Sequence, residues 1–386
     1  MTDRRSFLRS TSTIALGALS AGHLIAGSRP DLEQAPAPAK PESDPLRNLI
    51  VINGLGGLDE TYAPLPPGPP ALITTRALLA GKASGMTALN MTLSGDDNFE
   101  STIAAVAEYD AFIRSHPSQL MKVYTTADIR RAKAERKIGI IYGFQNAAMV
   151  GDKVERVDTF ANLGVRCIQL TYNPLNQLGG GSMAPGDPGL TPFGHEVVAR
   201  LNERRVMVDL SHSGRQICLD AARASKAPIS INHTGCKAIV DVPRNKTDEE
   251  LKLVADKGGY IGIYFVMFVA QGRAATVDDV VAHIRHAINV CGEDHVGIGS
   301  DYGIVDPGEA GAVRAFWAEF VRERVENHRA ATGEDPNILP FAEGLTGPDQ
   351  FRTLYRALGK AGLRTVQIEK VLGLNYLRFA KEIWGA

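Results

Sequence analysis

The sequence is poor in cysteine and carries almost no net charge, and each shortage excludes a class of protein. Four cysteines in 386 residues are too few for a disulfide-stapled scaffold, so the fold must depend on a hydrophobic core. Lysine and arginine total 42 and aspartate and glutamate 43, a formal charge of −1. The chain therefore has no excess of basic residues of the kind that binds nucleic acid or an anionic membrane surface. We therefore expect no nucleic-acid partner.

The sequence does contain enough apolar material for a large core. Hydrophobic residues make up 44% of the chain and charged residues 22%, a composition that excludes global disorder. The length allows two or three ordinary domains, although barrels often run longer as single domains.

The N-terminus has the pattern of an export signal. Residues 4–8 read Arg-Arg-Ser-Phe-Leu, and a short apolar run follows at residues 14–26. This order resembles a twin-arginine signal, and the run is shorter than the roughly 20 apolar residues of a membrane span. We expect residues 1–28 to engage the twin-arginine export machinery and to direct the chain to the periplasm or outside the cell. Residues 29–46 hold five prolines and indicate a solvated linker.

Short apolar runs, most of them rich in Val and Ile, recur through residues 47–386. Such runs are typical of strands buried on both faces of a parallel sheet. The predicted strands are Leu49–Asn53, Met86–Leu93, Ile138–Phe144, Arg166–Thr171, Val206–Leu210, Ile229–Ile231, Tyr260–Phe265 and Val296–Gly299. The helices predicted between them are Asn98–Ser115, Thr126–Arg136, Glu155–Leu163, Gly194–Glu203, Arg215–Ala224, Asp248–Asp256 and Val277–Cys291.

This alternation predicts an α/β fold in which residues 47–386 form a single (β/α)8 barrel of the TIM type. A doubly wound open sheet is the alternative, but no glycine-rich phosphate turn follows the first strand. Residues 306–347 break the alternation and are predicted to be an insertion with a helix. Residues 349–383 are predicted to form two closing helices.

Catalytic groups of such barrels stand at the C-terminal ends of the strands, where His212, His233 and Asp301 are found. Two imidazoles and a carboxylate can hold a divalent ion such as zinc and leave one position open for water. Position alone equally allows two structural histidines and a capping aspartate. His283 and His286 share one face of a predicted helix, and we expect that face to meet solvent.

Five stretches carry a family resemblance. They are Leu-Thr-Pro-Phe-Gly-His-Glu-Val-Val at 190–198, Val-Asp-Leu-Ser-His at 208–212, Asn232-His233 followed by Arg244-Asn245, His-Val-Gly-Ile-Gly-Ser-Asp at 295–301, and Gly-Leu-Asn-Tyr-Leu-Arg at 373–378. On these motifs the sequence resembles the membrane dipeptidase (renal dipeptidase) family of the amidohydrolase superfamily, from about the first strand to the C-terminus. The resemblance implies a (β/α)8 barrel with two zinc ions that hydrolyses dipeptides and, in some members, related amides or β-lactams.

The resemblance also implies residue roles. His212 and His233 match the two histidines that hold the second metal. Asp301 matches the carboxylate that binds the first metal and handles the proton. Arg244 matches the arginine that grips the substrate carboxylate, a task that suits the always-charged, bidentate guanidinium. We therefore expect a substrate with a free carboxylate, and a homodimer would fit the family.

The sequence departs from the family at the metal site. The His-x-Asp pair of the first strand has become Leu55 and Gly57, which cannot ligate through a side chain. The bridging glutamate appears as Gln145, and a neutral amide is a poor bridge between two cations. The histidine that contacts the reacting carbonyl appears as Tyr172.

Charge arithmetic then favours one ion over two. Two zinc ions bring a charge of +4, which the family meets with three carboxylates, and here Asp301 alone remains. We expect one zinc ion on His212, His233 and Asp301, with Gln145 or water completing its shell. We further expect Tyr172, with Asp301, to be catalytic.

Arg244 is expected to bind the substrate together with two asparagines, Asn173 and Asn53, that also line the predicted pocket. The sequence thus predicts an exported dipeptidase-like metallohydrolase that cleaves a dipeptide or a related small amide by metal-activated water. Two alternatives stay open. One is an enzyme that tailors a peptide-derived metabolite, and the other is a non-catalytic ligand-binding barrel descended from a dipeptidase.

Overall fold

The computed structural model describes residues 44–60, 72–95 and 97–385. The predicted export signal and almost all of the predicted linker lie outside the described residues. The first described residues already pack against the rest of the protein. Leu46 is fully buried, and Asp44 forms an ion pair of 2.8 Å with Arg352. All four cysteines are free thiols.

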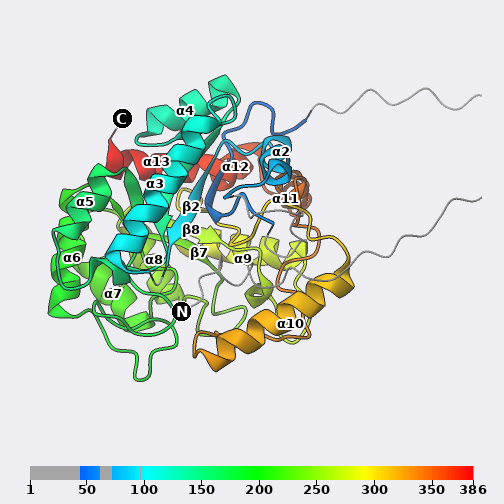
Figure 1. The fold of residues 1–386 in the computed structure, drawn as a ribbon. Helices are drawn as coiled ribbons and strands as arrows, with labels where there is room; N and C mark the ends of the chain where they lie inside the picture. Colours follow the sequence, from blue (N-terminus) through cyan, green and yellow to red (C-terminus); the bar gives the residue numbers. More distant parts are fainter. Residues whose placement is uncertain (1–43, 61–71, 96, 386) are drawn as a thin grey trace, which may run out of the picture.

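Eight parallel strands form the predicted barrel, with helices around it (Figure 1). Each of the eight predicted strands is present, within a few residues of its expected bounds. In spatial order they are β1 (Ile52–Gly56), β2 (Ala88–Ser94), β4 (Ile138–Phe144), β5 (Val165–Gln169), β6 (Met207–Asp209), β7 (Ser230–Thr234), β8 (Tyr260–Ile263) and β9 (Val296–Ile298). A ninth strand, β3 (Leu120–Lys122), pairs with β4 off this path and was not predicted.

Hydrogen bonds between β1 and the residues that follow β9 (Val296–Ile298) link the last strand to the first. The side chain of Asn53 on β1 donates to Ser300 Oγ at 2.7 Å and accepts from the Ser300 backbone N–H at 2.8 Å. The backbone N–H of Asp301 donates to the carbonyl of Leu55 at 3.0 Å. One buried amide thus joins the first strand to the last.

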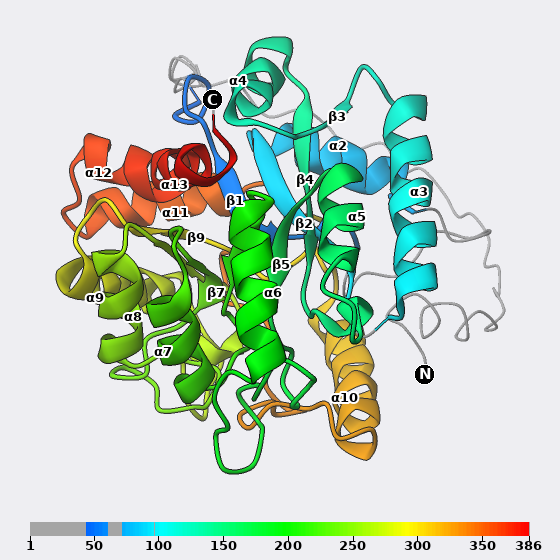
Figure 2. The ribbon, with the colours of Figure 1, turned by 90° about the vertical axis from the view of Figure 1, so that its left-hand side faces the viewer.

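The seven predicted inter-strand helices are all present and lie outside the barrel (Figure 2). They are α3 (Phe99–Ser115), α4 (Thr126–Glu135), α5 (Arg156–Asn162), α6 (Pro192–Glu203), α7 (Arg215–Ala224), α8 (Asp248–Asp256) and α9 (Val277–Cys291). The start of α8 illustrates the local cause, because Thr247 and Glu250 cap each other there. The structure adds α2 (Thr75–Ala83), which was not predicted.

The predicted insertion contains α10 (Ala310–Glu326), and the C-terminal segment is longer than two simple helices. It contains α11 (Gln350–Lys360) and a run of α12 (Thr365–Glu369), a π-helical turn (Lys370–Leu374) and α13 (Asn375–Trp384). Figure 2 shows α10 and α13 at opposite ends of the barrel.

Aromatic residues of α13 pack against the strands. The ring of Tyr376 meets that of Tyr260 on β8 edge to face, with centroids 5.1 Å apart. A glycine is required in the π-helical turn, because a Cβ on Gly373 would lie 2.1 Å from the carbonyl oxygen of Ile50.

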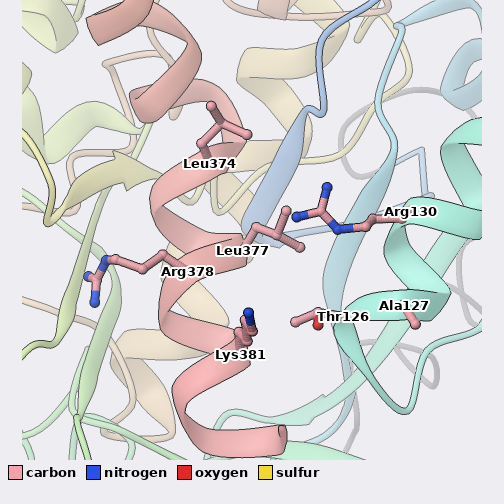
Figure 3. A pocket seen from close by; sticks show the side chains of 7 residues that line it. All are labelled: Thr126, Ala127, Arg130, Leu374, Leu377, Arg378 and Lys381. Carbon is pink, nitrogen blue, oxygen red and sulfur yellow. The ribbon is translucent and has the colours of Figure 1, made fainter. Parts of the chain in front are cut away.

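A hollow of about 410 Å³ lies between α4 and α13 (Figure 3). Its lining combines apolar and basic side chains: Thr126, Ala127, Arg130, Leu374, Leu377, Arg378 and Lys381. None of these is a predicted site residue. Among the described helices, none is both long enough and apolar enough to cross a bilayer.

His283 contradicts the expectation of a solvent-exposed histidine face on α9. Its side chain is fully buried: Nδ1 accepts from the Cys236 backbone N–H at 2.8 Å, and Nε2 donates to the Val269 carbonyl at 3.2 Å. Burial lowers the pKa of His283 to about 4. His286, three residues further on, is partly exposed and lies 2.8 Å from Asp248. Because both ring nitrogens of His283 are paired, the inner face of α9 can hold a neutral imidazole.

This burial predicts an acid-sensitive stability. Below its ordinary pKa near 6.5, His283 gains a proton in the unfolded chain but not in the folded one until the pH nears 4. The free energy of unfolding should therefore fall as the pH drops through this window, with about 3 kcal/mol attributable to His283. Urea denaturation at stepped pH should show a shallower fall for His283→Gln and an unchanged fall for His286→Gln. Equal slopes in the wild type and His283→Gln would contradict this account.

Candidate functional site

The C-terminal ends of β5, β6 and β7 bring several predicted site residues together. The ring centroids of His212 and His233 lie 5.0 Å apart, with the planes inclined at 59°. Tyr172 stacks on His212 at 4.2 Å and 21°. Tyr172 and His212 follow β5 and β6 directly, whereas His233 belongs to β7 itself. The strand-end positions seen in the sequence therefore do converge for these three residues.

A buried carboxylate, Asp209 at the end of β6, fixes the positions of both histidines. It accepts hydrogen bonds from the backbone N–H of Ser211 at 3.0 Å, from Ser230 Oγ at 2.8 Å and from the backbone N–H of Asn232 at 2.7 Å. Burial raises the pKa of Asp209, whereas these hydrogen bonds favour the charged form and oppose that rise. The Asp209 carboxylate thus links β6 to β7 by hydrogen bonds immediately before His212 and His233. Sequence reasoning did not assign it a role, although it belongs to the Val-Asp-Leu-Ser-His motif.

Two asparagine side chains set the tautomers of the imidazoles. His212 Nδ1 donates to Asn173 Oδ1 at 2.7 Å, and His233 Nδ1 donates to Asn232 Oδ1 at 2.5 Å. Each Nε2 atom then carries the lone pair, as an imidazole ligand of a metal requires. Among the described residues, the buried Nε2 atom of His233 has no hydrogen-bond partner. The sequence analysis placed Asn232 in a motif but assigned it no role.

The predicted substrate-binding asparagines both make hydrogen bonds within the protein. Besides accepting from His212, Asn173 donates from Nδ2 to the Arg329 carbonyl at 3.0 Å. The amide of Asn53 bonds to Ser300 and closes the barrel, as described above. Gln145 follows β4, and its backbone carbonyl accepts from Gln169 Nε2 at 2.5 Å.

Basic side chains surround the two histidines. Arg244 is 1% exposed; it donates from Nη1 to the Ser211 carbonyl, and its Nη2 has no hydrogen-bond partner among the described residues. Lys246 is equally buried and lies 3.7 Å from Glu250. Burial and then the charge of Arg244 lower the pKa values of His212 and His233 well below the ordinary range. Both imidazoles are therefore neutral.

The insertion supplies another wall of the site. Arg324 of α10 lies 5.9 Å from the ring centroid of Tyr172, and its Nη1 is 3.4 Å from the Tyr172 hydroxyl. Its Nε and Nη2 donate to Glu334 at 2.9 and 2.8 Å. Tyr172 therefore lies between His212 and a fixed guanidinium. No motif marked Arg324, because α10 belongs to the segment that breaks the strand-helix alternation.

The third expected ligand of the metal site is Asp301. Within the part of the chain that the structure describes, no three or more His, Cys, Asp or Glu side chains are arranged to hold a metal ion. The structure brings His212 and His233 together, and the inclusion of Asp301 as their common ligand stays a prediction. Strand β8 separates β7, which carries His233, from β9, which precedes Asp301. The charge of Asp301 instead acts on Tyr264, whose pKa it helps to raise after burial.

Two of the expected ligands, His212 and His233, are in the tautomer that a metal requires, but Leu55 and Gly57 are not ligands. The unpartnered Nε2 of His233 and the tautomers fixed by Asn173 and Asn232 favour imidazole ligation. Leu55 is buried and apolar, and a Cβ on Gly57 would lie 2.3 Å from Asp59 Oδ2. Leu55 and Gly57 therefore provide no side-chain ligands, and the carboxylate of Asp59 lies beside Gly57.

Comparison with known proteins places this geometry in context. Residues 85–331 match the family model described as "Membrane dipeptidase (Peptidase family M19)". The dipeptidase tcpJ of Claviceps purpurea is 26% identical over 302 residues, which cover 75% of this chain and 63% of that protein.

Two solved structures are similar over most of their length. An amidohydrolase from Pseudomonas aeruginosa is 31% identical, with a TM-score of 0.76 and coverage of 89% of this chain and 99% of that one. A metallopeptidase from Rhodobacter sphaeroides, bound to a phosphinate mimic of the dipeptide L-Ala-D-Ala, is 19% identical. Its TM-score is 0.68, with coverage of 87% of this chain and 99% of that chain, and this likeness shows the fold alone.

The Asp209 network predicts a large loss of stability on removal of its carboxylate. Asp209→Ala should lower the free energy of unfolding by about 2 kcal/mol or more, because three buried donors lose one charged acceptor. Asp241→Ala, which changes an exposed carboxylate paired with Lys237 at 3.2 Å, should cost less than about 1 kcal/mol. Chemical denaturation measures both, and equal losses would show that Asp209 has no special structural role.

Proposed function

Because this chain belongs to the membrane dipeptidase family, we propose that it is an exported hydrolase of a dipeptide or a related small amide with a free carboxylate. The observation that carries the substrate class is Arg244. This guanidinium is buried beside His212 and His233, and its Nη2 has no partner among the described residues. A buried donor of this kind is costly unless a ligand accepts from it, and a carboxylate is the matching acceptor.

One zinc ion held by the Nε2 atoms of His212 and His233 is the cofactor that we propose. Membership in a family of metallopeptidases supports a divalent ion, and the fixed tautomers of the two imidazoles support these ligands. When bound, such an ion supplies Lewis-acid activation of water and of the amide carbonyl.

Residues of the chain itself then bind the substrate and transfer protons. Arg244 binds and orients the substrate carboxylate. The hydroxyl oxygen of Tyr172 accepts from Arg324, so its own hydrogen is available to donate to the amide carbonyl, the group that the family contacts with a histidine. Asp301, whose charge acts on the Tyr264 ring that Arg244 also faces, is the carboxylate that we propose to hold the proton for the leaving amine.

The departures from the family support a second candidate, a ligand-binding barrel without turnover. The specific observation is that no three-residue metal-ligating group forms among the described residues. Such a protein would keep Arg244 and its carboxylate specificity but cleave nothing.

Hydrolysis is tested with purified, zinc-supplemented protein and a panel of dipeptides, each also supplied with an amidated C-terminus. The wild type should prefer the free carboxylate, and Arg244→Gln should lower kcat/KM by about 10- to 100-fold for the free form alone. Arg215→Gln, at an exposed arginine paired with Glu249, should behave as the wild type. Absence of any turnover would reject the hydrolase, and ligand-induced stabilisation without turnover would support the binding barrel.

Export is tested separately by replacing Arg4 and Arg5 with lysine. If residues 1–28 engage the twin-arginine machinery, this conservative change should retain the protein in the cytoplasm, whereas Arg9→Lys should not. Cell fractionation and immunoblotting measure the distribution. Equal export of both variants would contradict a twin-arginine route.

A further inference from the structure

The hollow between α4 and α13 is separate from the candidate functional site. Arg324 of α10 contacts Tyr172 at that site, whereas Figure 2 shows α13 at the opposite end of the barrel. The volume of the hollow, about 410 Å³, is within the range of pockets that bind small molecules. The proposed hydrolysis makes no use of its lining.

Two basic side chains in this lining have no acidic partner. Arg378 pairs with Glu382 at 2.7 Å, and Figure 3 shows its guanidinium pointing away from the hollow. Arg130 of α4 and Lys381 of α13, by contrast, form no ion pair with any described residue. The hollow therefore holds two positive charges, one from each helix, that a negatively charged ligand would neutralise.

The first turn of α4 adds hydrogen-bond donors to the same hollow. Thr126 is only 5% exposed, and its hydroxyl has no hydrogen-bond partner among the described residues. The backbone N–H groups of Thr126 and Ala127 lie at the start of the helix, where no intrahelical acceptor is available. A buried hydroxyl without a partner is costly unless a ligand or solvent pairs with it. Thr126 therefore indicates a ligand that carries an oxygen acceptor.

The one carboxylate of this first turn is already occupied by other donors. Asp128 accepts from the backbone N–H groups of Tyr124 and Thr125, each at 2.9 Å, and pairs with Arg131 at 2.8 Å. Its charge is balanced within α4 and leaves Arg130 unpaired. The start of a helix also favours a negative charge, because its free N–H groups carry partial positive charge.

The rest of the lining is mainly apolar and follows one face of the C-terminal segment. Leu374, Leu377 and Lys381 are spaced by three and then four residues, which places side chains on the same side of a helix. Leu374 is 36% exposed, although it is a large apolar side chain. A ligand with an apolar group would remove these leucines from water, and a bare inorganic anion would not.

We propose that this hollow binds an amphipathic oxyanion, a phosphate or carboxylate head attached to an alkyl or aromatic group. The head accepts from the Thr126 hydroxyl and is neutralised by Arg130 and Lys381. The apolar group lies along Leu377 and Leu374. Such a ligand contacts both helices and so stabilises the attachment of α13 to the barrel. This inference does not depend on the proposed hydrolysis.

Calorimetric titration with four probes tests the site: hexyl phosphate, heptanoate, inorganic phosphate and hexanol. At least one of the two amphipathic anions should bind about tenfold more tightly than inorganic phosphate, which lacks the apolar group, and than hexanol, which lacks the charge. Comparison of hexyl phosphate with heptanoate identifies the preferred head. Its affinity should fall as the salt concentration rises, and its binding should raise the melting temperature.

Variants of the lining localise the binding. The double variant Arg130→Gln/Lys381→Gln removes both unpaired charges and should weaken the preferred probe about tenfold. Thr126→Val should weaken it several-fold through loss of one hydroxyl donor. Leu374→Gln should lower the affinity toward that of inorganic phosphate.

Two control variants should keep the affinity of the wild type. Lys252→Gln changes an exposed lysine that is paired with Asp256 on α8. Arg244→Gln removes the guanidinium of the candidate functional site, where a carboxylate probe would otherwise bind. Circular dichroism checks that each variant is folded, and the double variant changes only exposed side chains.

The outcomes separate this inference from the proposed hydrolysis. Equal affinities for hexanol and both amphipathic anions, or unchanged affinity in the double variant, would overturn the oxyanion site. Binding that is lost in Arg244→Gln but kept in the double variant would also overturn it. A protein that cleaves dipeptides and binds no probe rejects this inference alone, whereas binding that follows these variants without dipeptide cleavage rejects the hydrolase alone.

Discussion

The buried carboxylate of Asp209 is the constraint on which the site depends. Its oxygens accept from donors on both sides of the β6–β7 junction, so two strands and the two loops that follow them share one acceptor. An acid in an apolar barrel is tolerated only when its hydrogen bonds compensate for lost hydration. Because His212 lies three residues after Asp209 and His233 follows Asn232, the backbone geometry of both histidines depends on this single carboxyl group.

Sequence reasoning succeeded where the pattern is local or repeated. Strands buried on both faces leave continuous runs such as Ile138–Phe144, and the alternation of these runs with amphipathic helices predicts a barrel. Strand-end position identified His212 and His233, because strand ends converge in that architecture, and the family resemblance added Arg244. The same strand-end argument predicted that Asp301 would join the histidines, and that placement stays a prediction. Position at a strand end determines which rim a residue occupies but not its distance around that rim.

The residues that sequence reasoning missed act through contacts that no pattern records. Asn232 fixes a tautomer through one oxygen, and Arg324 reaches Tyr172 from a helix about 150 positions later. His283 was misjudged for a similar reason. An imidazole counts as polar in a helical pattern, yet it packs like an apolar side chain once both of its nitrogens are paired.

The connection between α10 and Tyr172 bears on how this barrel can diversify. Arg324 and the neighbouring carbonyl of Arg329 attach the insertion to Tyr172 and Asn173, while Glu334 holds the guanidinium rigid. Segments inserted after a barrel strand vary in length and composition far more freely than the strands themselves. A change of ligand preference could therefore arise by exchange of this one module between related proteins, with the strands and their histidines left untouched.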